Sequence, residues 1–169
     1  MKTPLRLLLA ILFTLAVARA EEKNGLSVTV SKTVIEKNDT RGTGGSYDRI
    51  NRTQGLKATI KNLSFKEMPE GEIVWTILVR KYSSSMVEIY TGTEKLKALK
   101  PAETADMVIG NAEVSGYKDI GSVEKDKIEW QVTIKQEGKE LIKVQSTSAF
   151  DSLAKHATKP TSTTKKNAN

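Results

Sequence analysis

This 169-residue chain contains no cysteine, and its single histidine, His156, lies close to the C-terminus. Without these residues in the body of the chain, a Ser-His-Asp triad, a Cys-His pair and a histidine or thiolate zinc site are excluded there. No disulfide can form, so the stability of a folded domain must come from its apolar core. The sequence therefore predicts neither a metal nor a cofactor.

Catalysis or ligand binding could still depend on a pair of carboxylates, a glycine-rich loop or a calcium loop. Two carboxylates could hydrolyse a glycoside, but the 20 acidic residues are scattered mostly over polar faces and turns, and no pair stands out. The glycine-rich residues 42–46 are not followed by the lysine of a phosphate-binding loop. Asp39 and Asp48 lack the alternating oxygen ligands of a calcium loop. We therefore predict that the protein is not an enzyme.

The central part of the chain has no excess charge of either sign, although the whole sequence has a formal net charge of +7. Of the 27 basic residues, three precede residue 21 and four follow Ser152, which leaves 20 basic against 20 acidic residues between them. This neutral region gives no support to nucleic-acid binding. The lysines after Ser152 are spread out and indicate a solubilising tail; contact with an anionic surface is the alternative.

The first 20 residues are typical of an export signal. A basic start is followed by an apolar run over residues 7–17, which is too short to span a bilayer, and then by the small-x-small site Ala18-Arg19-Ala20. We expect the mature protein to begin at Glu21, to have no membrane span, and to reach the periplasm, the cell surface or the medium. Because exported animal domains usually carry disulfides, the absence of cysteine favours a bacterial envelope.

Short segments with a two-residue apolar period follow the signal and are separated by turn residues. The clearest is residues 127–135, with Ile128, Trp130 and Val132 on one face. Residues 72–81 are apolar at nearly every position and indicate a central strand buried on both faces. The predicted strands are 26–37, 49–61, 72–81, 86–91, 103–109, 127–135 and 141–147, with 94–100 as either an edge strand or a helical turn.

Long connections are predicted at residues 38–48 and 110–126, and a serine-rich turn at residues 82–85. The first is expected to be a mobile loop, and the second a crossover that is partly packed. If residues 94–100 are not an independent strand, all three connections emerge at the same end of an antiparallel sandwich. Their tyrosines would then cluster into a candidate contact surface made of Tyr47, Tyr82 and Tyr117.

Trp75 and Trp130 share their strand faces with apolar neighbours. We predict that both are core anchors, because burying so large a ring contributes strongly to the stability of a small domain. Sugar stacking by exposed indoles is the alternative.

Seven to eight short strands and no long amphipathic helix predict an all-β fold, an antiparallel sandwich without a disulfide. With Trp75 on the third strand and the Trp130 hairpin as the last pair, the layout resembles an immunoglobulin-like or fibronectin type III-like domain over residues 26–150. It lacks the cysteines and a legible tyrosine corner of true immunoglobulins. The predicted domains are a signal peptide (1–20), the sandwich (21–152) and a disordered tail (153–169).

The layout is also similar to small secreted immunoglobulin-like proteins that mucus-dwelling gut bacteria make alongside pilus components. This resemblance implies a role around pili or adhesion. Together with the export signal, it predicts an envelope or surface protein that binds other proteins; a carbohydrate-binding module for mucus or envelope glycans is the alternative. Homo-oligomers could form by pairing of the predicted edge strand 86–91, which carries few blocking charges.

Overall fold

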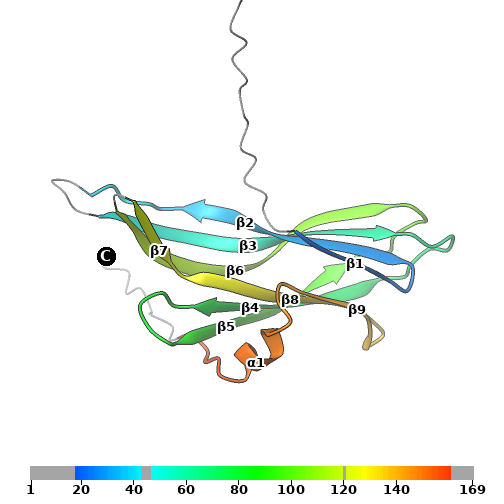
Figure 1. The fold of residues 1–169 in the computed structure, drawn as a ribbon. Coiled ribbons are helices and arrows are strands. Elements are labelled where there is room, and N and C mark those ends of the chain that lie inside the picture. Colours follow the sequence, from blue (N-terminus) through cyan, green and yellow to red (C-terminus); the bar gives the residue numbers. More distant parts are fainter. Residues whose placement is uncertain (1–17, 43–46, 120, 161–169) are drawn as a thin grey trace, which may run out of the picture.

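The computed structural model describes residues 18–42, 47–119 and 121–160. Within these ranges, nine strands form two antiparallel sheets that pack face to face, with one short helix outside them (Figure 1). The predicted all-β sandwich is confirmed, with nine described strands where the sequence predicts seven to eight. The elements are β1 (Arg19–Lys23), β2 (Leu26–Lys37), β3 (Asp48–Asn62), β4 (Gly71–Arg80), β5 (Val87–Leu96), β6 (Thr104–Asp119), β7 (Ser122–Lys125), β8 (Lys127–Gln136), β9 (Lys139–Gln145) and α1 (Phe150–Ala154).

The strands of each sheet run along the long axis of an elongated molecule (Figure 1). One sheet has the order β1-β2-β3-β6-β7 and the other the order β5-β4-β8-β9. The chain crosses between the sheets after β3, after β5 and after β7. Connections therefore collect at the two ends of the sandwich, where residues far apart in the sequence meet.

The core lies between the sheets, because alternate side chains of both sheets point inward. Val28, Leu56 and Ile77 come from three different strands, and none of them is accessible to solvent. The two predicted core anchors, Trp75 and Trp130, are both buried in this core. The periodicity of the strands thus places the indoles inside the sandwich rather than on its surface.

The Trp75 indole lies between two glycines, one from each sheet. Gly92 is its partner across β4 and β5, and a Cβ atom at Gly92 would overlap the indole ring. Gly110 has a φ of +66°, and a Cβ atom there would approach the ring Cε3 to 3.0 Å. The predicted strand end at residue 91 is wrong, because β5 continues through Gly92 to Leu96 and leaves no helical turn over residues 94–96.

The predicted crossover at residues 110–126 is also wrong. Strand β6 continues through Gly110 to Asp119 and then returns as β7 in a hairpin. Pairing of β3 with β6 passes this point through a register shift between Gln54 and Leu56. The irregularity next to Gly110 interrupts the apolar alternation, so the sequence pattern is that of a strand end although the strand goes on.

The C-terminal segment forms a short helix and one β-bridge over residues 150–160, where the sequence predicts a disordered tail from residue 153. Phe150 at the start of α1 is buried against Leu78 and Val87 on the outer face of the β4–β5 pair. Beyond the helix, the Thr158 amide donates to the Val87 carbonyl at 2.8 Å, and the Ile89 amide donates to the Thr158 carbonyl at 2.9 Å. Residues 161–169 lie outside the described residues.

These contacts also revise the edge-strand prediction. Residues 155–160, here called the C-terminal strap, pair through Thr158 with Glu88 in parallel and cover the start of the β5 edge. The strap has few apolar residues of its own. It is held because Phe150 packs on the apolar outer face of the β4–β5 pair and because the edge of β5 offers backbone hydrogen bonds. The β5 edge at residues 87–89 is therefore already paired within the chain and is not open to a second copy.

The predicted export signal falls mostly outside the described residues, which exclude residues 1–17. Arg19 and Ala20, at the predicted cleavage site, pair with Val30 and Thr29 as the first residues of β1. In the described ranges, no helix is long and apolar enough to cross a membrane.

Candidate functional site

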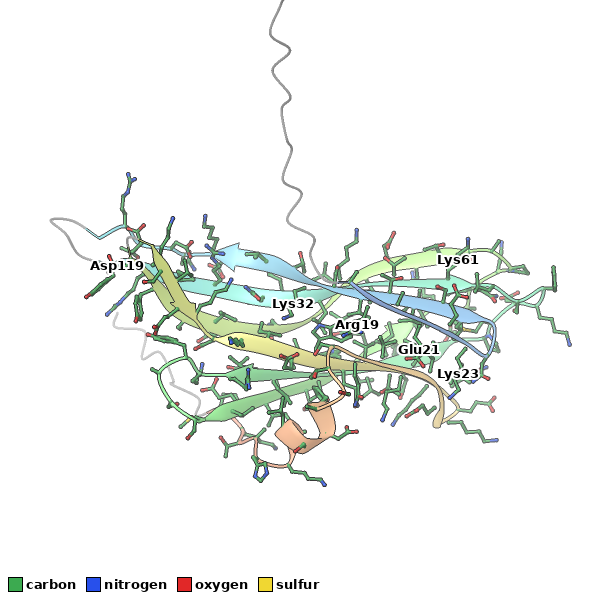
Figure 2. The ribbon with its side chains drawn as sticks, in the orientation of Figure 1. Arg19, Glu21, Lys23, Lys32, Lys61 and Asp119 are labelled. Atoms are coloured by element: carbon green, nitrogen blue, oxygen red, sulfur yellow. The ribbon has the colours of Figure 1, made fainter. Side chains whose placement is uncertain are left out.

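The three tyrosines predicted to form a contact surface lie together at one end of the sandwich. The Tyr47 and Tyr117 ring centroids are 5.5 Å apart, and those of Tyr82 and Tyr117 are 5.6 Å apart. Tyr47 immediately precedes β3, Tyr82 follows β4, and Tyr117 is near the end of β6. Figure 2 labels Asp119 at this end and Lys61 at the opposite end. We call this group the tyrosine cluster.

The tyrosine cluster borders an open hollow of about 800 Å³. Tyr47 is 60% exposed and Tyr82 is also exposed, whereas Tyr117 between them is half-buried. Arg49 and Asn51 of β3 line the same hollow. The surface therefore combines aromatic rings with hydrogen-bonding side chains.

Tyr82 is positioned by Asp126, a carboxylate that sequence reasoning missed. Asp126 is only 3% exposed and lies between β7 and β8. Its oxygens accept hydrogen bonds from the backbone amides of Tyr82 and Ser115, each at 3.0 Å. The Asp126 amide in turn donates to the Ser115 carbonyl at 2.9 Å. This carboxylate fastens the turn after β4 to the other sheet.

Lys81 neutralises the buried carboxylate. Its Nζ lies 3.2 Å from the Asp126 Oδ2 and 3.0 Å from the Glu88 Oε2. Burial alone would lower the pKa of Lys81, but its hydrogen bonds and charge interactions with Glu88 and Asp126 outweigh burial and raise that pKa. The ammonium group therefore stays charged, and the turn that carries Tyr82 is held from both sides.

Tyr117 is held in place by strand pairing and by a carboxylate. It pairs with Arg49 across β3 and with Glu124 across β7. A hydrogen bond to the Glu124 carboxylate is the main reason why the pKa of Tyr117 is raised, because ionising the phenol would place a second negative charge beside the first. The phenol thus remains a neutral donor.

The loop before Tyr47 is tied down on both flanks. The Arg52 guanidinium binds Asp39 through two nitrogens, with Nε 3.0 Å from Oδ1. This hydrogen bonding lowers the pKa of Asp39. The Gly42 amide donates to the Asp48 Oδ1 at 3.1 Å. Asp39 and Asp48 thus act as internal acceptors, and no group of three or more metal-ligating side chains occurs within residues 18–42, 47–119 and 121–160.

The remaining aromatic and titratable candidates lie elsewhere. Tyr90 is half-buried on β5 and donates a hydrogen bond to Glu88 at 3.0 Å, and its burial and this carboxylate raise its pKa. His156 lies in the C-terminal strap, away from the hollow of the tyrosine cluster. The hollow itself offers ring faces, ring edges and hydrogen-bonding groups, which suit binding.

Comparison with known proteins adds no functional information. No protein-family model and no curated protein matches this chain. Among solved structures, a crystal structure of a protein from Akkermansia muciniphila is 12% identical, with a TM-score of 0.38. The match covers 76% of this chain and 75% of that chain. Likeness at this level supports no argument about function, so the interpretation below rests on the residues themselves.

Proposed function

We propose that this protein is a non-enzymatic binding protein of the bacterial envelope or surface that contacts other proteins through the tyrosine cluster. One observation carries this proposal: tyrosines from three separate segments gather at one end and two of them stay exposed. Export rests on the predicted signal, and a role beside pili or in adhesion rests on the sequence resemblance.

The ring geometry favours a protein partner over a sugar. Tyr82 and Tyr117 meet at an interplanar angle of 71°, and Tyr47 and Tyr117 at 56°. Tilted rings present edges and hydroxyl groups rather than one flat platform on which a sugar could stack. Tyrosine is enriched in protein interfaces because it supplies a large, rigid contact area together with a hydrogen-bonding hydroxyl.

The rigidity of the site supports the same proposal. Asp126 and Glu124 fix the backbone of Tyr82 and the phenol of Tyr117, respectively, before any partner arrives. A preorganised surface loses less conformational freedom on binding and so retains more of its contact energy as affinity.

We further propose that the sandwich is immunoglobulin-like. The order β2-β3-β6 in one sheet and β5-β4-β8-β9 in the other corresponds to an A-B-E and C′-C-F-G arrangement. In that assignment Trp75 occupies the strand that carries the buried tryptophan of immunoglobulin domains. In that assignment the tyrosine cluster lies at the end of the A–B, C–C′ and E–F connections, opposite the B–C and F–G loops that bind in immunoglobulin variable domains.

Glycan binding is the second candidate function. It is favoured by Arg49 and Asn51, exposed polar side chains that line the hollow beside the rings and could bind sugar hydroxyls. Mucus or envelope glycans would be the ligands.

Crosslinking in the source cells tests the first proposal. Wild-type protein should crosslink to a defined partner protein, and Tyr47→Ala together with Tyr117→Ala should abolish that crosslink. Val108→Ala is the matched control, because Val108 is an exposed apolar residue of β6 outside the cluster. A crosslink that survives the double substitution would contradict the proposal. Glycan-array binding lost in the same variant would favour the second candidate.

A further inference from the structure

A fully exposed phenylalanine marks the end of the sandwich opposite the tyrosine cluster. Phe65, in the loop between β3 and β4, is 100% exposed, and Leu63 beside it is also exposed. Among the described residues, no other large apolar side chain reaches this exposure. An apolar ring exposed to water does not stabilise the fold, so its exposure indicates a contact with another molecule.

The loop that presents Phe65 is rigidly built. Asn62 is buried, and its Nδ2 donates to the carbonyls of Lys66 at 2.8 Å and Leu99 at 2.9 Å. Its Oδ1 accepts from the Ser64 amide at 2.9 Å and from the Ser64 hydroxyl at 2.7 Å. A buried side chain that makes four hydrogen bonds within a tight loop fixes the direction in which Phe65 projects.

An apolar groove of about 870 Å³ lies at the other end, beside the tyrosine cluster. It runs between the β4–β5 turn, strand β7 and the C-terminal strap. Met86 and Val123 are both exposed there, and Leu153 of α1 forms part of the wall. Its size and apolar surface suit a phenylalanine with a neighbouring leucine.

The charges around the groove and the loop are complementary. Arg80, Lys125 and Lys127 line the groove, and none of them forms an ion pair within the described ranges. Glu124 is the one acidic residue among the groove's lining residues, so their unpaired charge is positive. On the loop, Lys66, Glu67 and Glu70 are exposed close to Phe65 in the sequence, which gives residues 63–70 a net charge of −1. Opposite charges around an apolar contact favour association and set its orientation.

The loop cannot reach the groove of its own chain. Strand β4 begins directly after the loop and ends at Arg80 in the groove. At roughly 3.3 Å per residue, its ten residues span about 30 Å. Figure 1 shows β4 running along the molecule between these ends. A contact between loop and groove therefore has to join two molecules.

We propose that the loop of residues 63–70 docks into the Met86–Val123 groove of a second copy of this chain. The contact is head to tail, so a pair of molecules still has one free loop and one free groove. Such contacts propagate into open chains or close into rings. Tyr82 lines this groove as well as the hollow of the tyrosine cluster, whereas Tyr47 and Tyr117 line the hollow and not the groove. The interface extends the proposed function by supplying a way to assemble.

An anionic membrane is the competing partner for an exposed phenylalanine. The net negative charge of residues 63–70, from Glu67 and Glu70 against Lys66, would be repelled by anionic lipid headgroups. The same two carboxylates are attracted to the cationic groove, which is why we assign the loop to a second copy.

Two single variants and their mixture test this assignment by sedimentation velocity. Wild-type protein should show a mass that rises with concentration beyond a dimer. Phe65→Asp removes the loop contact and Val123→Glu removes the groove contact, so each alone should weaken association at least about tenfold. Mixed in equal amounts, the two variants retain one intact loop and one intact groove, and they should form a heterodimer that grows no further.

Charge reversal gives an independent test that leaves the apolar residues in place. Lys125→Glu with Lys127→Glu should weaken association, and mixing this variant with Glu67→Lys, Glu70→Lys protein should restore a dimer. Circular dichroism shows whether each variant is folded, and Val108→Asp on an exposed strand position is the matched control.

Several outcomes would overturn the proposal. These are a monomeric wild type at all concentrations, undiminished association of Phe65→Asp, or variant mixtures that stay monomeric while the wild type assembles. Co-sedimentation with phosphatidylglycerol vesicles that is lost in Phe65→Asp would instead assign the loop to a membrane. Because Tyr47→Ala with Tyr117→Ala should leave self-association intact, failure of this proposal is distinguishable from failure of the proposed function.

Discussion

The Asp126 carboxylate accepts a hydrogen bond from the Tyr82 backbone amide at 3.0 Å, across 44 residues of sequence. It joins the turn after β4 to the junction of β7 and β8, and thereby joins the two sheets at the end that carries the tyrosine cluster. The stability of this end and the geometry of the candidate site consequently depend on one buried side chain.

Asp126→Ala should destabilise the protein by about 2–4 kcal/mol, because it leaves the Tyr82 and Ser115 amides without their acceptor. Urea unfolding followed by circular dichroism measures the change. Asp151→Ala is the control, since Asp151 is exposed and, among the described residues, accepts a side-chain hydrogen bond from Gln145 alone. Its loss of stability should stay below about 0.5 kcal/mol. Equal costs for the two variants would contradict the structural role of Asp126.

Gly92→Ala should lower the free energy of unfolding by about 1–3 kcal/mol, because the added methyl group overlaps the Trp75 indole. The near-ultraviolet circular dichroism of tryptophan should change as well. A double-mutant cycle provides the control: in a Trp75→Leu background the same alanine should cost clearly less. An unchanged cost in that background would show that the strain arises elsewhere.

The raised pKa of Tyr117 predicts a pH dependence of the site. Its neutral phenol is favoured in the folded protein, so its contribution to stability is present below the ordinary tyrosine pKa and is lost as pH rises through the folded-state pKa. Phenolate absorbance should therefore develop at higher pH in native protein than in urea-unfolded protein. Glu124→Gln should move part of that titration to lower pH, whereas Glu140→Gln on β9 should not. Identical titrations for both variants would contradict the pairing.

Phe150→Ala should lower the free energy of unfolding by about 3 kcal/mol, because it removes the buried ring that packs α1 on the outer face of the β4–β5 pair. Hydrogen exchange of the Ile89 amide should also become faster, since the strap that accepts its hydrogen bond would loosen. Phe65→Ala is the matched control: it removes an equal side chain that touches no core, so its cost should be near zero. A small loss for Phe150→Ala would mean that the strap is dispensable.

The fold was largely predictable from local pattern. Two-residue periodicity around Trp130 and the apolar run around Trp75 indicate strands, and a chain without cysteine or long helices has to bury those faces against each other. Failures occurred where tertiary packing overrides local signals. Gly92 and Gly110 are typical strand breakers, yet both are retained inside strands because the Trp75 ring needs the space a side chain would fill.

The candidate site was predictable only in part. Tyr47, Tyr82 and Tyr117 were expected to cluster because their segments emerge at one end of an antiparallel sandwich, and they do, although Tyr117 lies on β6 rather than in a crossover. Asp126 was missed because an isolated acidic residue between two lysines is typical of an exposed turn. Its burial depends on backbone amides contributed by β6 and by the turn after β4.

What the sequence determined by itself is the class of fold, the inward faces of the strands and the lack of cysteine or histidine chemistry in the body of the chain. These follow from composition and from the two-residue repeat of a strand, which are local properties. Three features depend instead on how distant segments pack: the strands pass through glycine, the C-terminal strap covers β5, and Phe65 points into solvent while Phe150 is buried. The physical reason is that burial depends on which distant surfaces a side chain meets, and two phenylalanines in similar polar surroundings cannot be told apart until those surfaces are in place.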